Sequence, residues 1–138
     1  MTLVDSNVLL DIFTKDPKWW EWSLMRLEEA TLRGALLIND VIYAETSVRF
    51  RRIEDFAATL EKAGVTFAPI PRTALFLAGK AFMQYRSSGG VRTGVLPDFF
   101  IGAHAMVESL PLLTRDARRY RNYFPKAVLI APDGDRLG

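Results

Sequence analysis

Thr2-Leu3-Val4-Asp5-Ser6-Asn7, residues 2–7, is an apolar run that ends at a carboxylate and an amide. Such a run is typical of a strand buried inside a parallel sheet, and residues 7–13 after it look like a short helix. Similar apolar runs follow at residues 35–38, 65–68, 112–114 and 128–130. Helical segments separate them, and this alternation predicts a three-layer α/β/α domain with a central parallel sheet of four to five strands.

The chain has 138 residues, of which 49% are hydrophobic, and this length and composition predict one compact domain. We expect the domain to cover residues 1–131 and residues 132–138 to form a short C-terminal tail. No apolar run approaches the roughly 20 residues that cross a bilayer, so we expect no membrane partner. The N-terminus lacks the basic and apolar regions of a signal peptide, which predicts a cytoplasmic protein.

Four acidic residues stand where a parallel sheet would gather them: Asp5, Glu45, Asp98 and Asp116. Asp5 and Asp116 lie at or just past the ends of predicted strands, Asp98 lies in the first turn of a predicted helix, and Glu45 lies one turn into another. In parallel α/β sheets, ligands bind beyond the carboxyl ends of the strands, so all four can face one crevice. Two carboxylates about 4 Å apart repel by roughly 4 kcal/mol at an effective dielectric near 20. A divalent cation or bound protons would relieve that repulsion.

Each acid also has an ordinary structural interpretation. Asp5 and Asp116 could cap the helices that follow them, Asp98 suits a helix start, and Glu45 could be a solvated helix residue. The metal hypothesis depends on the four together, in a chain without cysteine and with His104 as its single histidine. Those absences exclude thiolate and zinc-protease sites and leave oxygen ligands, which favour Mg²⁺ or Mn²⁺. His104 lies in an apolar helix and is expected to be packed rather than catalytic.

The charge pattern favours a polyanionic substrate. The 18 basic residues exceed the 12 acidic residues outside the candidate site by six, which indicates an acidic crevice in a basic surround. We expect Arg115, beside Asp116, to bind substrate phosphate, and Arg86 and Arg92, which flank a glycine-rich loop at 87–94, to assist. The glycines of that loop match neither a P-loop nor a dinucleotide fingerprint.

The helix after Asp16-Pro17 is predicted to begin there, with aspartate as the N-cap and proline at the first helical position. Its spacing places Trp20, Leu24 and Leu27 on the core face. The same spacing points Trp22 to the polar face, where it would mark an interface or be covered by a neighbouring loop.

Four motifs together resemble a known family: residues 4–11 (VDSNVLLD), 43–45 (YAE), 96–105 (LPDFFIGAHA) and 113–116 (LTRD). They are similar to the signatures of PIN-domain ribonucleases, and more narrowly to VapC toxins of bacterial type II toxin–antitoxin systems. The resemblance covers essentially the whole chain. It implies that Asp5, Glu45, Asp98 and Asp116 are catalytic, metal-binding carboxylates, with Asn7 and Thr114 as polar supports.

The activity that this resemblance implies is hydrolysis of RNA phosphodiester bonds by a Mg²⁺- or Mn²⁺-dependent endonuclease. The metal would activate a water and hold the scissile phosphate. The resemblance also implies a transfer RNA or ribosomal RNA substrate, a VapB-type antitoxin and a homodimer. The RNA target, the cleavage sequence, the number of metal ions, the antitoxin's identity and the physiological trigger stay open at this stage.

Two other functions fit parts of the sequence. A non-catalytic PIN-like domain would bind RNA or protein without cutting, and the complete set of four acids counts against it. A phospho-receiver domain also gathers acids around magnesium. It needs a phosphoacceptor aspartate at the end of a mid-chain strand and a late lysine, neither of which is evident here.

Overall fold

A five-stranded parallel sheet forms the centre of the computed structural model, which describes residues 1–132. The strands are β1 (Thr2–Val4), β2 (Leu36–Ile38), β3 (Val65–Phe67), β4 (Leu112–Leu113) and β5 (Leu129–Ile130). They lie in the order β3-β2-β1-β4-β5, and every neighbouring pair is parallel. The predicted parallel α/β fold is confirmed. The tail predicted at 132–138 lies, apart from Pro132, outside the described residues.

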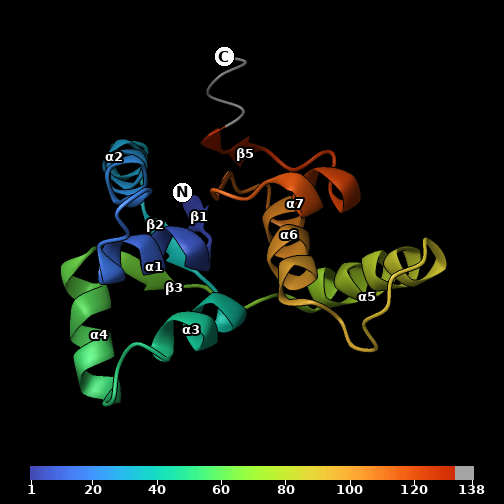
Figure 1. Ribbon diagram of the computed structural model, residues 1–138, viewed down its shortest axis with the longest axis horizontal. Helices are drawn as coiled ribbons and strands as arrows, with labels where there is room; N and C mark the ends of the chain where they lie inside the picture. The colour runs from blue at the N-terminus through green and yellow to red at the C-terminus, as the bar shows by residue number, and fades with distance from the viewer. Residues whose placement is uncertain (133–138) are drawn as a thin grey trace.

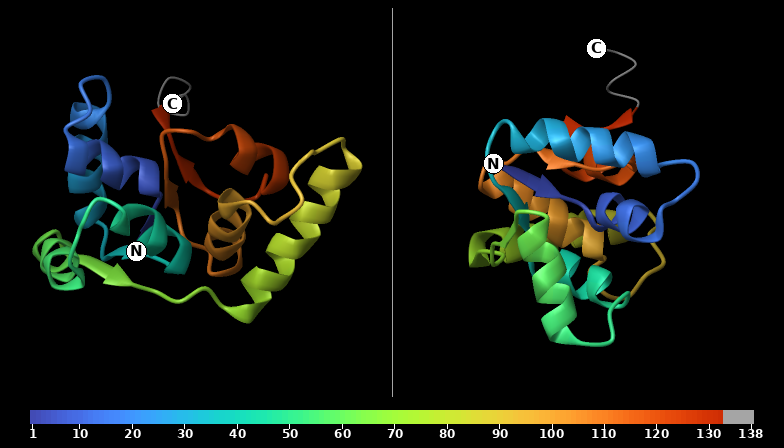
Figure 2. Two further views of the ribbon diagram at one scale, coloured as in Figure 1. Left: turned by 60° about the horizontal axis from the view of Figure 1, so that its bottom comes forward. Right: turned by 90° about the vertical axis from the view of Figure 1, so that its left-hand side faces the viewer.

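Helices flank the sheet. They are α1 (Ser6–Thr14), α2 (Trp20–Thr31), α3 (Asp40–Ser47), α4 (Ile53–Lys62), α5 (Arg72–Ser87), α6 (Pro97–Val107) and α7 (Arg118–Tyr123). Helix α1 packs against α2 and α3, whereas α6 packs against α3, α5 and α7. Helices α4 and α5 lie at opposite ends of the molecule (Figures 1 and 2). Within residues 1–132, no helix combines the length and hydropathy that spanning a membrane requires.

The middle of the sheet holds the most deeply buried apolar residues. Leu3 and Val4 of β1 and Leu112 and Leu113 of β4 have no exposed surface, whereas Phe67 on the edge strand β3 is 47% exposed. Val4 pairs with Leu113, so the residues that follow these two strands are neighbours at the carboxyl edge of the sheet. The backbone N–H of Asp5 continues this pairing by donating to the Leu113 carbonyl at 2.9 Å.

The prediction for α2 was wrong in its first helical residue and in most of its buried face, although Asp16 does act as a cap and Leu27 is buried. The Asp16 carboxylate accepts hydrogen bonds from the backbone N–H groups of Lys18 and Trp19, each at 2.9 Å, and so caps a separate turn. The helix itself begins at Trp20 and buries Ser23, Leu27 and Ala30. Trp22 packs against the core, in an edge contact with Trp19.

Candidate active site

Asp5 lies at the end of β1, and its carboxylate is surrounded by hydrogen-bond donors. It caps α1 by accepting from the backbone N–H of Ser6 at 2.8 Å. Its second oxygen accepts from the hydroxyl groups of Thr114 and Tyr120, both at 2.8 Å. The residue is only 4% exposed. Asp5, which the sequence predicts to be a metal ligand, is therefore also the N-cap of α1.

Asn7 and Thr114 connect β1 to β4 around Asp5. The Asn7 amide donates to the Thr114 hydroxyl at 3.3 Å and lies 3.4 Å from the Asp5 carboxylate. The Asn7 carbonyl oxygen accepts from the backbone N–H of Arg115 at 3.2 Å. The structure thus places both predicted polar supports in direct contact with Asp5.

Tyr120 joins Asp5 to Asp98, a contact that sequence reasoning missed. Its hydroxyl donates to Asp5 and lies 3.5 Å from an oxygen of Asp98 in the first turn of α6. Helix α7 brings Tyr120 there because it packs closely on α6: a Cβ at Gly102 would meet the Phe124 ring at 2.4 Å. The only sequence signal was a tyrosine on the apolar face of a short helix, since a buried phenol needs a hydrogen-bond partner.

Burial and like charge change the titration of this pair. Burial raises the pKa of the Asp5 carboxyl to about 6, although the hydrogen bonds from Tyr120 and Thr114 favour its charged form. Burial also raises the pKa of Asp98, while the nearby Arg119 guanidinium opposes that shift and Asp116 adds to it. The Tyr120 phenol has a pKa well above its usual range because it is buried beside both carboxylates. Tyr120 therefore stays protonated as a donor.

Glu45 and Asp116 lie around this centre. Glu45, one turn into α3, accepts a 2.6 Å hydrogen bond from the Ser6 hydroxyl, which is itself 3.4 Å from Asp5. Asp116 is exposed, and its backbone N–H donates to the Thr114 hydroxyl at 3.1 Å. It does not cap α7, which begins after Ala117 without a side-chain cap. The structure therefore places all four predicted acids at one edge of the sheet.

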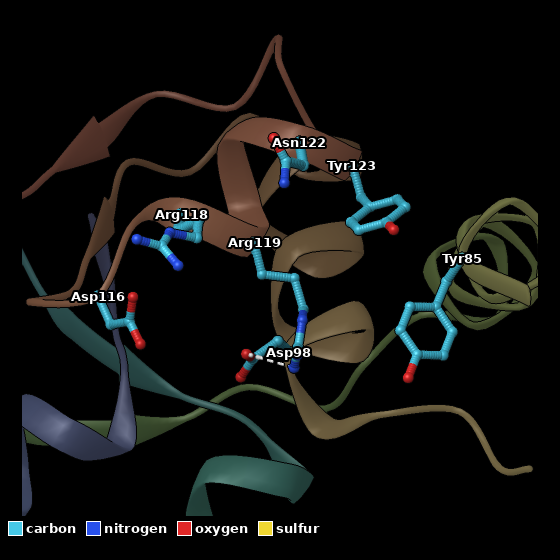
Figure 3. Close-up of a pocket in the computed structure, with 7 residues that line it drawn as sticks. All are labelled: Tyr85, Asp98, Asp116, Arg118, Arg119, Asn122 and Tyr123. Carbon is cyan, nitrogen blue, oxygen red and sulfur yellow. Dashed lines mark hydrogen bonds and ion pairs between the residues drawn. The ribbon is translucent and has the colours of Figure 1, made fainter. Parts of the chain in front are cut away.

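An open cavity of about 560 Å³ adjoins the acids, and we call it the first cavity. Its lining residues are Tyr85, Asp98, Asp116, Arg118, Arg119, Asn122 and Tyr123. Figure 3 shows Arg119 extending from α7 to Asp98, where its guanidinium donates to the carboxylate at 3.3 Å. The cavity thus combines two carboxylates with two arginines, a pattern suited to a phosphate that approaches a cation.

The acidic residues that the structure describes are not arranged as a complete set of metal ligands. Within residues 1–132, no group of three or more His, Asp or Glu residues is arranged so that it could hold a metal ion. Donors of the protein instead contact the oxygens that a cation would use: Tyr120 on Asp5, and Arg119 on Asp98. A metal at Asp98 would require Arg119 to turn away, whereas Tyr120 can keep its hydrogen bond to Asp5 because a carboxylate accepts several partners.

The predicted phosphate-binding arginines have internal partners. The Nε of Arg115 donates to both oxygens of the buried Asp11, at 3.1 and 2.9 Å, a partner that sequence reasoning missed. The guanidinium of Arg86 donates to the carbonyls of Gly90 and Arg92, at 3.2 and 2.9 Å, and so folds the glycine-rich loop back onto α5. Arg92 is exposed.

His104 is buried away from this cavity, as expected for a packed residue. It is 2% exposed, and its Nδ1 accepts from the Asn39 amide at 3.1 Å. Burial lowers its pKa. The Asn39 carbonyl oxygen caps α3 by accepting from the backbone N–H of Ile42 at 3.0 Å. His104 thus supports the helix that carries Glu45.

Comparisons with known proteins agree with this fold. The family model described as PIN domain matches residues 2–125. No curated protein matches the chain in sequence.

Several solved structures have the same fold. A chain of VapBC-1 from nontypeable Haemophilus influenzae matches with a TM-score of 0.68 and 16% identity over 94% of this chain and 96% of that one. A chain of VapBC2 from Rickettsia felis, solved bound to a DNA fragment from the promoter, has a TM-score of 0.67 and 16% identity, with coverages of 94% and 97%. A chain of a toxin–antitoxin complex from Klebsiella pneumoniae has a TM-score of 0.64 and 18% identity, over 96% of this chain and 98% of that one. At these identities the likeness concerns the fold alone.

Proposed function

This chain belongs to the PIN domain family, and from that premise we propose that it is a Mg²⁺- or Mn²⁺-dependent endoribonuclease and the toxin of a VapBC-type pair. PIN domains are generally nucleases. The observation that carries the proposal is the contact of Asp5 and Asp98 with one Tyr120 hydroxyl, beside a cavity that Asp116 and two arginines line. Carboxylates held this close, with raised pKa values, suit a cation that would neutralise them.

The donor set fits a hard divalent metal in kind. All the candidate ligands are carboxylate oxygens, which Mg²⁺ and Mn²⁺ prefer. Asp5 and Asp98 would hold the ion, with Asp116 and Glu45 as further ligands. When bound, such a metal supplies Lewis-acid stabilisation of phosphate charge and lowers the pKa of water.

The protein's own residues would fix and neutralise this site. Thr114 and Tyr120 hold one oxygen of Asp5, so that the carboxylate keeps a single orientation. Arg119 supplies a positive charge to Asp98 and, from the wall of the first cavity, can turn to a substrate phosphate. Ser6 links Glu45 to this network.

RNA is the proposed substrate, and the arginines are the proposed phosphate ligands. Arg118 and Arg119 line the first cavity and supplement the sequence-based candidates. Arg115 binds Asp11 through Nε, which leaves its terminal nitrogens for a phosphate. Arg92 is exposed on the loop beside Tyr85, whereas Arg86 would act by shaping that loop. Transfer RNA and ribosomal RNA are the candidate targets, and mapping the ends of the cleaved fragments would distinguish them.

A VapB-type antitoxin, a homodimer and a cytoplasmic location complete the proposal. One structural neighbour is a toxin–antitoxin complex, and the VapBC structures share its fold. The antitoxin would neutralise the toxin by covering the acidic crevice.

Cleavage of total cellular RNA by the purified chain tests the activity. We expect discrete fragments with Mg²⁺ or Mn²⁺, and intact RNA with chelator or with the Asp98→Asn variant. Asp55→Asn, the same substitution at an exposed position of α4, is the matched control and should cleave normally. Intact RNA in every lane, from folded protein free of other chains, would favour the alternative: a PIN-like domain that binds RNA or protein without cutting.

A further inference from the structure

A second cavity lies next to the first, on the other side of Asp116. Its volume is about 440 Å³, and we call it the basic cavity. Its lining residues are Trp19, Arg115, Asp116, Ala117, Arg118, Arg121, Asn122 and Pro132. Asp116, Arg118 and Asn122 line both cavities, so the two are adjacent. A strand placed with one phosphate at the acids would extend into the basic cavity.

Arg115 is held in position on the wall of this cavity. Its Nε is fixed by Asp11, which is 2% exposed and also accepts a 2.7 Å hydrogen bond from the Ser23 hydroxyl. Its guanidinium carbon lies 5.6 Å from the centre of the Trp19 ring. One third of the arginine side chain is nevertheless exposed. The protein therefore presents a rigid guanidinium and an indole together, rather than a mobile surface arginine.

The basic cavity is lined mainly by positive charges, whereas the candidate metal site is lined mainly by carboxylates. Three arginines, at 115, 118 and 121, line it with one acid, Asp116. The Arg118 guanidinium makes no hydrogen bond or ion pair with any residue of the described part of the chain. Phosphate is an anion that the forked N–H donors of guanidinium groups recognise well.

We propose that the basic cavity binds the nucleotide that neighbours the scissile phosphate of a single-stranded RNA. Arg115 and Arg118 contact its phosphate, and its base packs against the Trp19 indole beside Arg115. Unpaired bases stack on aromatic rings and on guanidinium planes, and single-strand grooves pair such platforms with basic residues. This subsite rests on the proposed ribonuclease function.

Binding of a fluorescent eight-nucleotide RNA, measured by anisotropy at several salt concentrations, tests the phosphate contact. The Asp98→Asn background prevents cleavage. We expect Arg118→Ala to weaken binding about fivefold and to reduce the slope of log K against log salt by about 0.7, the value for one phosphate contact with a single strand. Arg33→Ala is the matched control. Arg33 is exposed just before β2, at the amino edge of the sheet, and should leave both quantities unchanged.

An abasic scan of the same RNA tests the stacking. With Trp19 present, we expect removal of one particular base to weaken binding about tenfold. In Trp19→Leu, checked for folding by circular dichroism, the same removal should have little effect, which gives a positive coupling energy.

Three results would overturn the subsite. Equal binding by the Arg118 and Arg33 variants would remove the phosphate contact. Loss of binding with no base position that depends on Trp19 would mean that the cavity attracts polyanions, including acidic peptides, without holding a nucleotide. Tighter binding after Arg118→Ala would exclude RNA from the cavity. Cleavage by the wild-type chain is a separate readout, so the subsite can fail while the ribonuclease function stands, and the reverse.

Discussion

The four acids of the site form two pairs that differ in how the fold supports them. We call Asp5 and Asp98 the Tyr120 pair, because both contact that hydroxyl, and Glu45 and Asp116 the rim pair. Asp5 accepts three hydrogen bonds of 2.8 Å, whereas Glu45 accepts one, from Ser6, and the carboxylate of Asp116 accepts none within residues 1–132. Burial raises the pKa values of both members of the Tyr120 pair, so their charged forms are less favourable in the folded protein than in water.

The difference indicates a division of roles. Groups that are fixed before a ligand arrives contribute most to binding and catalysis, because no reorganisation accompanies the reaction. Asp5 is fixed in this way by its three short hydrogen bonds. Asp98 is held less tightly, since Arg119 and Tyr120 lie 3.3 and 3.5 Å from its carboxylate. The rim pair can adapt to the metal and the substrate. The predictions that follow test whether this ranking holds.

The largest expected effect is the loss of activity on neutralising the Tyr120 pair. Asp98→Asn should lower RNA cleavage about a thousandfold, as much as the loss of one preorganised hydrogen-bond donor of an active site costs at most. Asp116→Asn should lower it only about tenfold, because Asp116 is exposed and weakly supported. Initial rates on a labelled RNA at saturating Mn²⁺ measure both. Equal losses in the two variants would contradict the ranking.

Asp5→Asn should abolish activity and remove the pH dependence that Asp5 gives to the free energy of unfolding. The Asp5 carboxyl has a pKa of about 6 in the fold, against 3.8 as its ordinary value. A raised pKa means that the folded state prefers the protonated form, so the free energy of unfolding falls as pH rises from about 4 to 6. At 1.36 kcal/mol per unit, the cost of the charge at neutral pH is about 3 kcal/mol.

Urea denaturation in chelator across pH 4–7 measures this effect. The stability of the variant relative to the wild type should rise by up to about 3 kcal/mol between pH 4 and pH 7. Asp55→Asn on α4 controls for the loss of one negative charge. If the free energy of unfolding changed with pH in the same way for the wild type and Asp5→Asn, burial would not raise the pKa of Asp5.

The positions of the four acids could be predicted from the sequence because they follow from the alternation of strands and helices in a parallel sheet. Strands of two to three residues were recognisable from apolar runs, and parallel strands bring their carboxyl ends to one edge. Asp5 and Thr114 directly follow two paired strands, so their contact is a consequence of register.

Tyr120 and Asp11 could not be predicted because their roles depend on tertiary packing. Tyr120 reaches Asp5 across 115 residues of sequence, through the close approach of α7 to α6. Asp11 looks like an ordinary helix residue until Arg115 is placed beside it. The buried face of α2 also depends on tertiary packing, since Trp22, and not Trp20, packs against the core.

Tyr120→Phe removes the hydroxyl that joins the Tyr120 pair and should change metal binding more than stability. We expect Mn²⁺ affinity to fall by about 10- to 100-fold, the usual effect of losing a partner of a ligand. Titration calorimetry with Mn²⁺ measures the affinity, and thermal denaturation shows whether the fold is intact. Tyr123→Phe, in the same helix and on the wall of the first cavity, is the matched control. Unchanged Mn²⁺ affinity would show that the carboxylates are positioned without Tyr120.

Asn39→Ala tests the rim pair through the helix that carries Glu45, and it should have the smallest effect. The substitution removes the N-cap of α3 and the partner of the buried His104 ring, so the free energy of unfolding should fall by about 1–2 kcal/mol in urea denaturation. Asn39→Ser keeps a capping hydroxyl but loses the histidine contact, and it should recover about half of that loss. RNA cleavage should fall only a few-fold, since Glu45 keeps its hydrogen bond to Ser6. A loss of cleavage as large as that of Asp98→Asn would mean that α3 positions Glu45 as strictly as Tyr120 positions its pair, and the division between the two pairs would not hold.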